Sequence, residues 1–96
     1  ALVTQGDSPG TVRAVVVPAG TGARIDAGEV VDLIPNPYEV NVGDRLQIVN
    51  ADSRTHEIGP FSVAANSTLE YEFNRPGTLS GACTVHPSGT VDIVVT

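Results

Sequence analysis

Three residues of this chain could do chemistry together. Its only cysteine, Cys83, lies three residues before His86, and the one other histidine, His56, lies 27 residues before Cys83. One thiolate and two imidazoles suit copper in a trigonal arrangement, or zinc with an open fourth position. The same residue types also permit a cysteine nucleophile with a histidine base, or three unrelated side chains. Residue types and spacing leave these alternatives open.

The segments on either side of these residues indicate how they could meet. TLSGAC (78–83) and TVDIVV (90–95) have the composition of β-strands, so TVHPSG (84–89) is the loop between them. Two ligands on one short loop can reach one metal ion. Because His56 follows the predicted strand RLQIVN (45–50), we expect one pole of a β-sandwich to gather all three residues.

The rest of the chain is consistent with an all-β fold. Ten glycines and seven prolines separate short segments rich in valine, isoleucine and threonine. TVRAVVV (11–17) reads as a strand, and YEVNV (38–42) and STLEYEFN (67–74) alternate apolar and polar residues as half-buried strands do. TGARIDAGEVVDLIPNP (21–37) is a long connection with one short helical or extended piece. We predict about seven or eight strands in one domain, residues 1–96.

Composition excludes several classes of partner. The net charge is −6, with eleven acidic residues against five arginines, so a nucleic acid would be repelled. No apolar run reaches the roughly 18 residues of a membrane-spanning helix, and the opening ALVTQGDSPG lacks the basic and apolar regions of a signal peptide. We therefore expect no transmembrane segment in this chain, although a membrane anchor outside it is compatible with the sequence. A single cysteine excludes an internal disulfide.

An ordered series of motifs over residues 37–95 carries a family resemblance. It begins with YEVNVGDRLQIVN and continues through ADSRTHEI, F-x-V, STLEYEF and RPGT to a C-T-x-H-P loop followed by GTVDIVV. In this order the motifs resemble those of small blue-copper cupredoxins of the plastocyanin, pseudoazurin and amicyanin type. The resemblance covers about three fifths of the chain.

The resemblance implies a fold, a cofactor and a function. The fold would be a Greek-key β-sandwich, and one copper ion, cycling between Cu(I) and Cu(II), would be held by His56, Cys83 and His86. The protein would be an electron carrier and not an enzyme. Redox protein partners would dock near His86, which lies between Val85 and Pro87. The location would be outside the cytoplasm: periplasmic, secreted or membrane-anchored.

Two features depart from the family pattern. The chain contains no methionine, so the usual axial ligand is missing, and the loop after His86 is about two residues shorter than in amicyanin-like sequences. The copper could then be three-coordinate, with a raised reduction potential, or it could take the carbonyl of Thr55 or a water molecule beside Ser88. Glu57 stands where many relatives have an asparagine that ties the ligand loops together.

Other functions remain compatible with the same residues. A truncated and more open ligand loop would suit a protein that buffers or delivers copper, and a cupredoxin-fold domain could also have lost its metal. A zinc site with Glu57 as general base is permitted by the spacing. An enzyme with Cys83 as nucleophile has no oxyanion-hole motif to support it.

Overall fold

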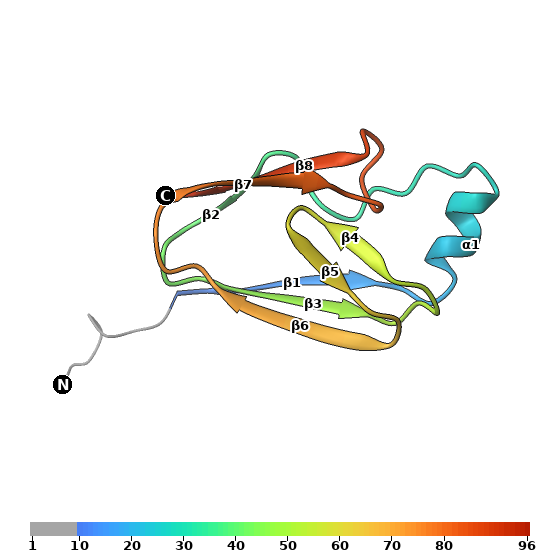
Figure 1. Cartoon of the computed structure of the whole chain (residues 1–96), viewed down its shortest axis with the longest axis horizontal. Coiled ribbons are helices and arrows are strands. Elements are labelled where there is room, and N and C mark those ends of the chain that lie inside the picture. The colour runs from blue at the N-terminus through green and yellow to red at the C-terminus, as the bar shows by residue number, and fades with distance from the viewer. Residues whose placement is uncertain (1–9) are drawn as a thin grey trace.

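A computed structural model describes residues 10–96 of the chain (Figure 1). Residues 1–9, most of the segment compared above with a signal peptide, lie outside the described residues. The described elements, in chain order, are β1 (Val12–Val17), α1 (Thr21–Asp26), β2 (Tyr38–Val40), β3 (Arg45–Asn50), β4 (His56–Ile58), β5 (Phe61–Val63), β6 (Ser67–Glu72), β7 (Gly77–Ala82) and β8 (Thr90–Val95).

The strands form two three-stranded sheets and a hairpin. One sheet has the order β1-β3-β6, the other has the order β2-β8-β7, and β4 pairs with β5. β1 lies parallel to β3 and β2 lies parallel to β8, whereas the remaining pairs are antiparallel. Figure 1 shows the two sheets as facing layers, with α1 at one end of the molecule and the β6–β7 connection at the other. The predicted all-β sandwich of about seven or eight strands is therefore confirmed.

Alternating side chains of β3 and β8 fill the space between the layers. Leu46 and Ile48 of β3, and Val91 and Ile93 of β8, are fully buried. Burying an aliphatic side chain of this size contributes about 1.5–3 kcal/mol. These residues hold the two sheets together and give the site at the end of the sandwich a packed support.

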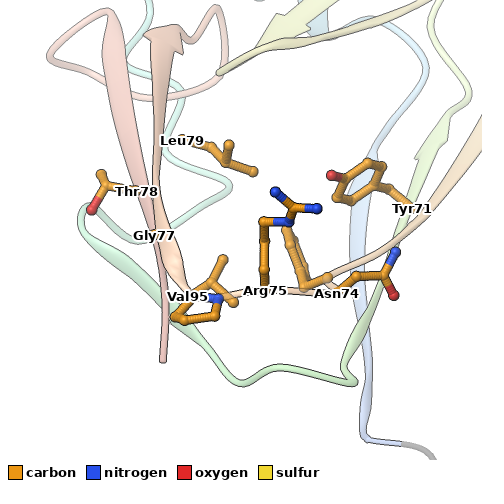
Figure 2. A pocket seen from close by; sticks show the side chains of 9 residues that line it. Tyr71, Asn74, Arg75, Gly77, Thr78, Leu79 and Val95 are labelled. Carbon is orange, nitrogen blue, oxygen red and sulfur yellow. The ribbon is translucent and has the colours of Figure 1, made fainter.

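One detail of the predicted alternation is wrong. Val42 was expected to continue the second strand, but β2 ends at Val40, and Val42 is exposed beside Gly43, whose φ of +96° turns the chain. Tyr71 is 41% exposed, and its ring lies 4.9 Å from that of Phe61 and 5.3 Å from that of Phe73, at the edge of the core. It also lines a pocket of about 400 Å³ where β6 leads into β7 (Figure 2).

The long connection over residues 21–37 contains the short helical piece that the sequence suggested, namely α1. The helix packs near the end of β3 and the start of β4, because Gly22 bonds Asp52 and Asp26 pairs with Arg54. No helix in the described residues has both the length and the apolar character needed to cross a membrane.

Candidate metal centre

The end of β7 and the start of β4 lie side by side. Cys83 follows β7 directly and forms an isolated antiparallel bridge with Ile58 of β4. The amide of Thr84 donates to the carbonyl of Glu57 at 2.9 Å, and the amide of Gly59 donates to the carbonyl of Ala82 at 2.8 Å. The strand that begins with His56 is therefore bonded to the segment that carries Cys83, as expected from the sequence.

A close backbone approach makes this arrangement possible. A Cβ atom placed on Gly81 would lie 2.5 Å from the carbonyl oxygen of Gly59, well inside van der Waals contact. Only glycine at position 81 lets the turn between β4 and β5 rest on β7. The sequence pattern SGAC thus has a structural reason next to the candidate ligand.

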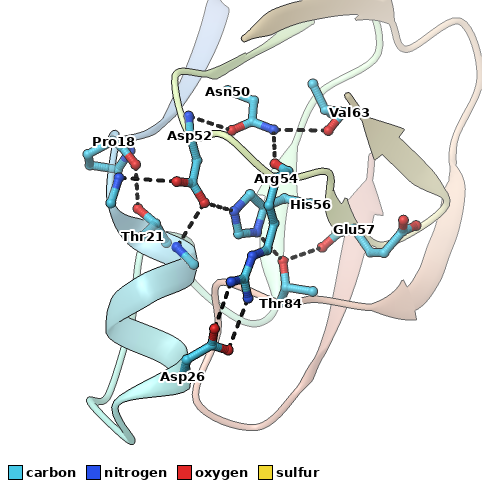
Figure 3. Close-up of polar contacts among 12 residues, drawn as sticks. Pro18, Thr21, Asp26, Asn50, Asp52, Arg54, His56, Glu57, Val63 and Thr84 are labelled. Atoms are coloured by element: carbon cyan, nitrogen blue, oxygen red, sulfur yellow. Dashed lines mark hydrogen bonds and ion pairs between the residues drawn. The ribbon is translucent and has the colours of Figure 1, made fainter. Parts of the chain in front are cut away.

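His56 is buried, and both of its ring nitrogens have partners. Nε2 lies 2.7 Å from Oδ2 of Asp52, and Nδ1 lies 2.7 Å from Oγ1 of Thr84 (Figure 3). An ionised carboxylate can only accept hydrogen bonds, so Nε2 carries the proton. In the Nε2-protonated tautomer Nδ1 accepts from the Thr84 hydroxyl, which also lies 3.5 Å from the carbonyl oxygen of Glu57.

Asp52 is a buried carboxylate held by backbone amides. Its Oδ1 accepts from the amide of Gly20 at 3.1 Å, and its Oδ2 accepts from the amide of Gly22 at 2.8 Å. The hydrogen bond from His56, together with those from the amides of Gly22, Ser53 and Gly20, lowers the pKa of Asp52 to about 2, although burial acts in the opposite direction. Asp52 could not be identified from the sequence, because nothing in NADSRTHEI distinguishes it from an ordinary loop aspartate.

Asn50 fixes the loop that carries Asp52. It is 1% exposed, and its side-chain amide donates to the carbonyls of Arg54, Val63 and Ala64 at 2.9–3.1 Å. Its Oδ1 accepts from the amide of Asp52. One buried side chain thus joins both ends of the loop and the strand beyond it.

Cys83 is 1% exposed. Burial raises the pKa of its thiol, and hydrogen bonds from the amides of Val85 and His86 oppose that rise. A buried thiol with a raised pKa is a poor nucleophile. Because the Nδ1 atoms of His56 and His86 are bonded elsewhere, the geometry gives the cysteine-nucleophile alternative no support.

His86 lies on the loop after Cys83 and is only partly buried. Its Nδ1 accepts from the amide of Ser88 at 3.0 Å and lies 2.7 Å from the Ser88 hydroxyl. The ring borders a groove of about 230 Å³, lined by Ile25, Glu29, Val30, Val31, Thr84, His86 and Pro87. The 21–37 connection supplies the apolar side of this groove, and the amide of Leu33 ties it to the carbonyl of Val85 at 2.9 Å.

Glu57 and Arg54 both have local partners. The Glu57 carboxylate accepts from the hydroxyl of Ser62, so its backbone, and not its side chain, joins the two ligand segments. Arg54 makes two bonds of 3.0 and 2.7 Å to the carboxylate of Asp26 on α1. Its guanidinium is therefore engaged within the chain.

The donor chemistry of the three candidates fits a copper ion. One thiol and two imidazoles are the soft and borderline ligands that Cu(I) and Cu(II) accept. Within residues 10–96, no three or more His, Cys, Asp or Glu side chains are gathered closely enough to hold a metal ion. The assignment of His56, Cys83 and His86 as ligands therefore stays a prediction.

Comparison with solved structures defines the class of fold. A purple cupredoxin from Nitrosopumilus maritimus matches 88% of this chain and 99% of its own length, with 20% identity and a TM-score of 0.58. A mutant of amicyanin solved in its Cu(I) form matches 98% of this chain and 86% of its own, with 19% identity and a TM-score of 0.55. No protein-family model and no curated protein matches the chain. The chain has the cupredoxin fold.

Proposed function

We propose that this chain, as one domain over residues 1–96, is a mononuclear type 1-like copper protein that carries single electrons between redox partners. His56, Cys83 and His86 would hold the ion. In this proposal the protein is an electron carrier and not an enzyme. Its place of action is outside the cytoplasm, as the family resemblance suggests.

One observation supports the proposal above the others. The buried Cys83 is bridged to the strand that begins at His56, and the hydroxyl of the next residue, Thr84, already contacts the lone pair of His56 Nδ1. A thiol and an unprotonated imidazole nitrogen thus belong to two bonded segments at one end of the cupredoxin fold. This is the chemistry that a Cys and His copper site requires.

The residues of the chain would hold the ligands still. Copper bound here would supply a one-electron couple between Cu(I) and Cu(II). His56 is held at Nε2 by Asp52, and Cys83 receives amide hydrogen bonds from Val85 and His86. Such a network of satisfied hydrogen bonds makes the surroundings rigid. Little of the protein then needs to move when the charge changes.

His86 would be the route for electrons to and from partner proteins. Its ring is partly exposed, and it borders the groove that contains the apolar residues Ile25, Val30 and Pro87. Val30 is 74% exposed, so the rim of this groove offers apolar contact area to a docking protein.

A copper buffer or delivery protein is the second candidate. The observation that favours it is the position of His86 Nδ1, which bonds within its own loop to Ser88. A ligand that can turn toward its loop would let copper enter and leave. The absence of methionine from the chain also removes the usual axial thioether.

The test is the addition of one equivalent of Cu(II) to the protein, followed by visible absorption and electron paramagnetic resonance spectra. We expect an intense thiolate-to-copper charge-transfer band and a narrow parallel hyperfine splitting. Cys83→Ser should remove the band, because the thiolate supplies its electron, while circular dichroism stays unchanged. Ser80→Ala, on the exposed side of β7, is the matched control and should keep the full colour.

Each other outcome points to a different function. Equal colour in Cys83→Ser and the wild type would overturn the ligand assignment. Weak colour with a wide splitting in the wild type would favour the copper buffer or delivery protein. A wild-type protein that leaves all of the Cu(II) free would indicate a cupredoxin-fold domain that has lost metal binding.

A further inference from the structure

The buried carboxylate of Asp52 lies beside His56 but is not one of the three candidate ligands. The side chains of Asp52 and His56 are 3% and 1% exposed, and Asp52 Oδ2 lies 2.7 Å from His56 Nε2. A charge in such a place is costly unless hydrogen bonds compensate it. Its retention next to a candidate ligand therefore needs a reason.

Backbone amides and the ring of His56 supply the hydrogen bonds of this carboxylate. It accepts from the amides of Gly20, Gly22 and Ser53. Arg54, which is close in sequence, directs its guanidinium to Asp26 instead (Figure 3). In the described residues, the imidazole of His56 is the only basic side chain within ion-pair distance of Asp52. The carboxylate is thus held by backbone amides at the back of the ring, against Nε2.

We propose that Asp52 is the positioning residue of this site: it fixes His56 in the Nε2-protonated tautomer and keeps a negative charge behind the ring. The inference rests on the proposed copper function. Metal-binding histidines commonly donate their second N–H to an acceptor, which orients the ring and makes the ligating nitrogen more basic. A full carboxylate does this more strongly than a carbonyl.

The negative charge of Asp52 would change the reduction potential of a bound copper ion. It stabilises Cu(II) more than Cu(I), because the interaction grows with the charge of the ion. Asp52 would thus lower the reduction potential, which opposes the rise expected when the axial thioether is missing. Because the chain has no methionine, this charge would keep the reduction potential lower than it would otherwise be.

The chain offers a matched control at the opposite end of β3. Asp44 is also a buried carboxylate with a side chain 3% exposed, but its partners are the guanidinium of Arg13 and the amides of Thr11 and Asn41. Asp44→Asn and Asp52→Asn each remove one negative charge from a buried position. Only Asp52 contacts a candidate ligand.

The first measurement uses the wild-type protein without metal, so it does not depend on how well a variant folds. Long-range ¹H–¹⁵N correlation spectra at pH 8 report which ring nitrogen of His56 is protonated. We expect a protonated Nε2 and an unprotonated Nδ1. A proton on Nδ1, alone or with Nε2 also protonated, would overturn the proposal.

The second measurement compares Cu(II) and Cu(I) dissociation constants by competition with chelators. Asp52→Asn should raise the Cu(II) dissociation constant by about 10–100-fold and the Cu(I) constant by less, so that the reduction potential rises. Asp44→Asn should behave as the wild type does. Equal effects of the two variants would refute a specific role for Asp52. If the wild type binds no copper but His56 has the expected tautomer, the proposed function fails, and what stands is that Asp52 sets the tautomer of His56 in the metal-free fold.

Discussion

The two ends of β3 each hold a buried aspartate, but the two carboxylates are compensated differently. Asp44, just before β3, lies 3.0 Å from the guanidinium nitrogen of Arg13. Asp52, two residues after β3, meets only backbone amides and the ring of His56. At the first end a guanidinium bonds the carboxylate directly, and at the second end backbone amides and an imidazole do.

This difference separates an aspartate that serves the fold from one that serves a site. The contacts of Asp44 join β1 to the turn before β3, and they end there, because no candidate ligand is among its partners. The contacts of Asp52 join α1 to a histidine whose other nitrogen faces Thr84. A buried carboxylate bonded to a candidate ligand therefore marks the end of the molecule where chemistry is expected.

The largest effect should come from breaking the loop that carries Asp52. Asn50→Ala removes the donor to the Arg54, Val63 and Ala64 carbonyls and the acceptor for the Asp52 amide. Loss of a buried network of this size should lower the free energy of unfolding by about 3 kcal/mol. Urea denaturation followed by circular dichroism measures it.

Gln47→Ala is the control for that change. Gln47 is on the same strand, and its side chain makes one exposed contact of 3.3 Å with Glu70. We expect a change within about 0.5 kcal/mol. A similar loss in both variants would mean that the hydrogen bonds of Asn50 do not hold the loop.

The sequence predicted the strands well because their signal is local. Residue types that favour strands, separated by glycine and proline, were enough to find β1, β3, β7 and β8, and the loop between Cys83 and β8 followed from them. How far Tyr71 is exposed could not be predicted, because alternation says which face a side chain takes but not how much of it the neighbouring elements cover. The β4–β5 hairpin was not predicted: the F-x-V motif was joined to STLEYEF, whereas it forms β5, which pairs with β4.

Candidate ligands could be found from the sequence, whereas the residues that hold them could not. Cys83 and His86 could be singled out by rarity and spacing alone. Asp52 could not, because its role depends on amides of Gly20 and Gly22, about 30 residues earlier, which reach it only in the folded chain. The function of Asn50 likewise depends on tertiary contacts.

Acid should affect the two ends unequally. The pKa of Asp52 is lowered to about 2, and that of Asp44 is lowered as well, chiefly by the hydrogen bond from the Asn41 amide. A carboxyl whose folded pKa is depressed contributes stability above its unfolded pKa, near 3.8, and this is lost as the pH falls through the folded value. The wild type should therefore lose stability between about pH 4 and pH 2.

The variants Asp52→Asn and Asp44→Asn show how much each carboxyl contributes to this loss of stability. Asp52→Asn should remove more of the pH dependence than Asp44→Asn, because its pKa shift is the large one. In each variant the difference from the wild type should be greatest at pH 7 and should shrink toward pH 2. Urea midpoints at a series of pH values provide the comparison. Curves for Asp52→Asn and the wild type that stay parallel would show that Asp52 is not linked to folding in this range.

The smallest effect should come from the exposed ion pair beside the site. Asp26 and Arg54 are bonded at 2.7 Å, but their side chains are 64% and 46% exposed, and exposed pairs contribute little. Asp26 is also the last residue of α1, where a negative charge opposes the helix dipole, so its removal has a compensating benefit. Asp26→Ala should leave the thermal midpoint unchanged within error, whereas Arg13→Leu, which strips a buried carboxylate of its cation, should lower it. An equal fall in both variants would mean that Arg54, and not Asp52 with Asn50, holds the loop in place.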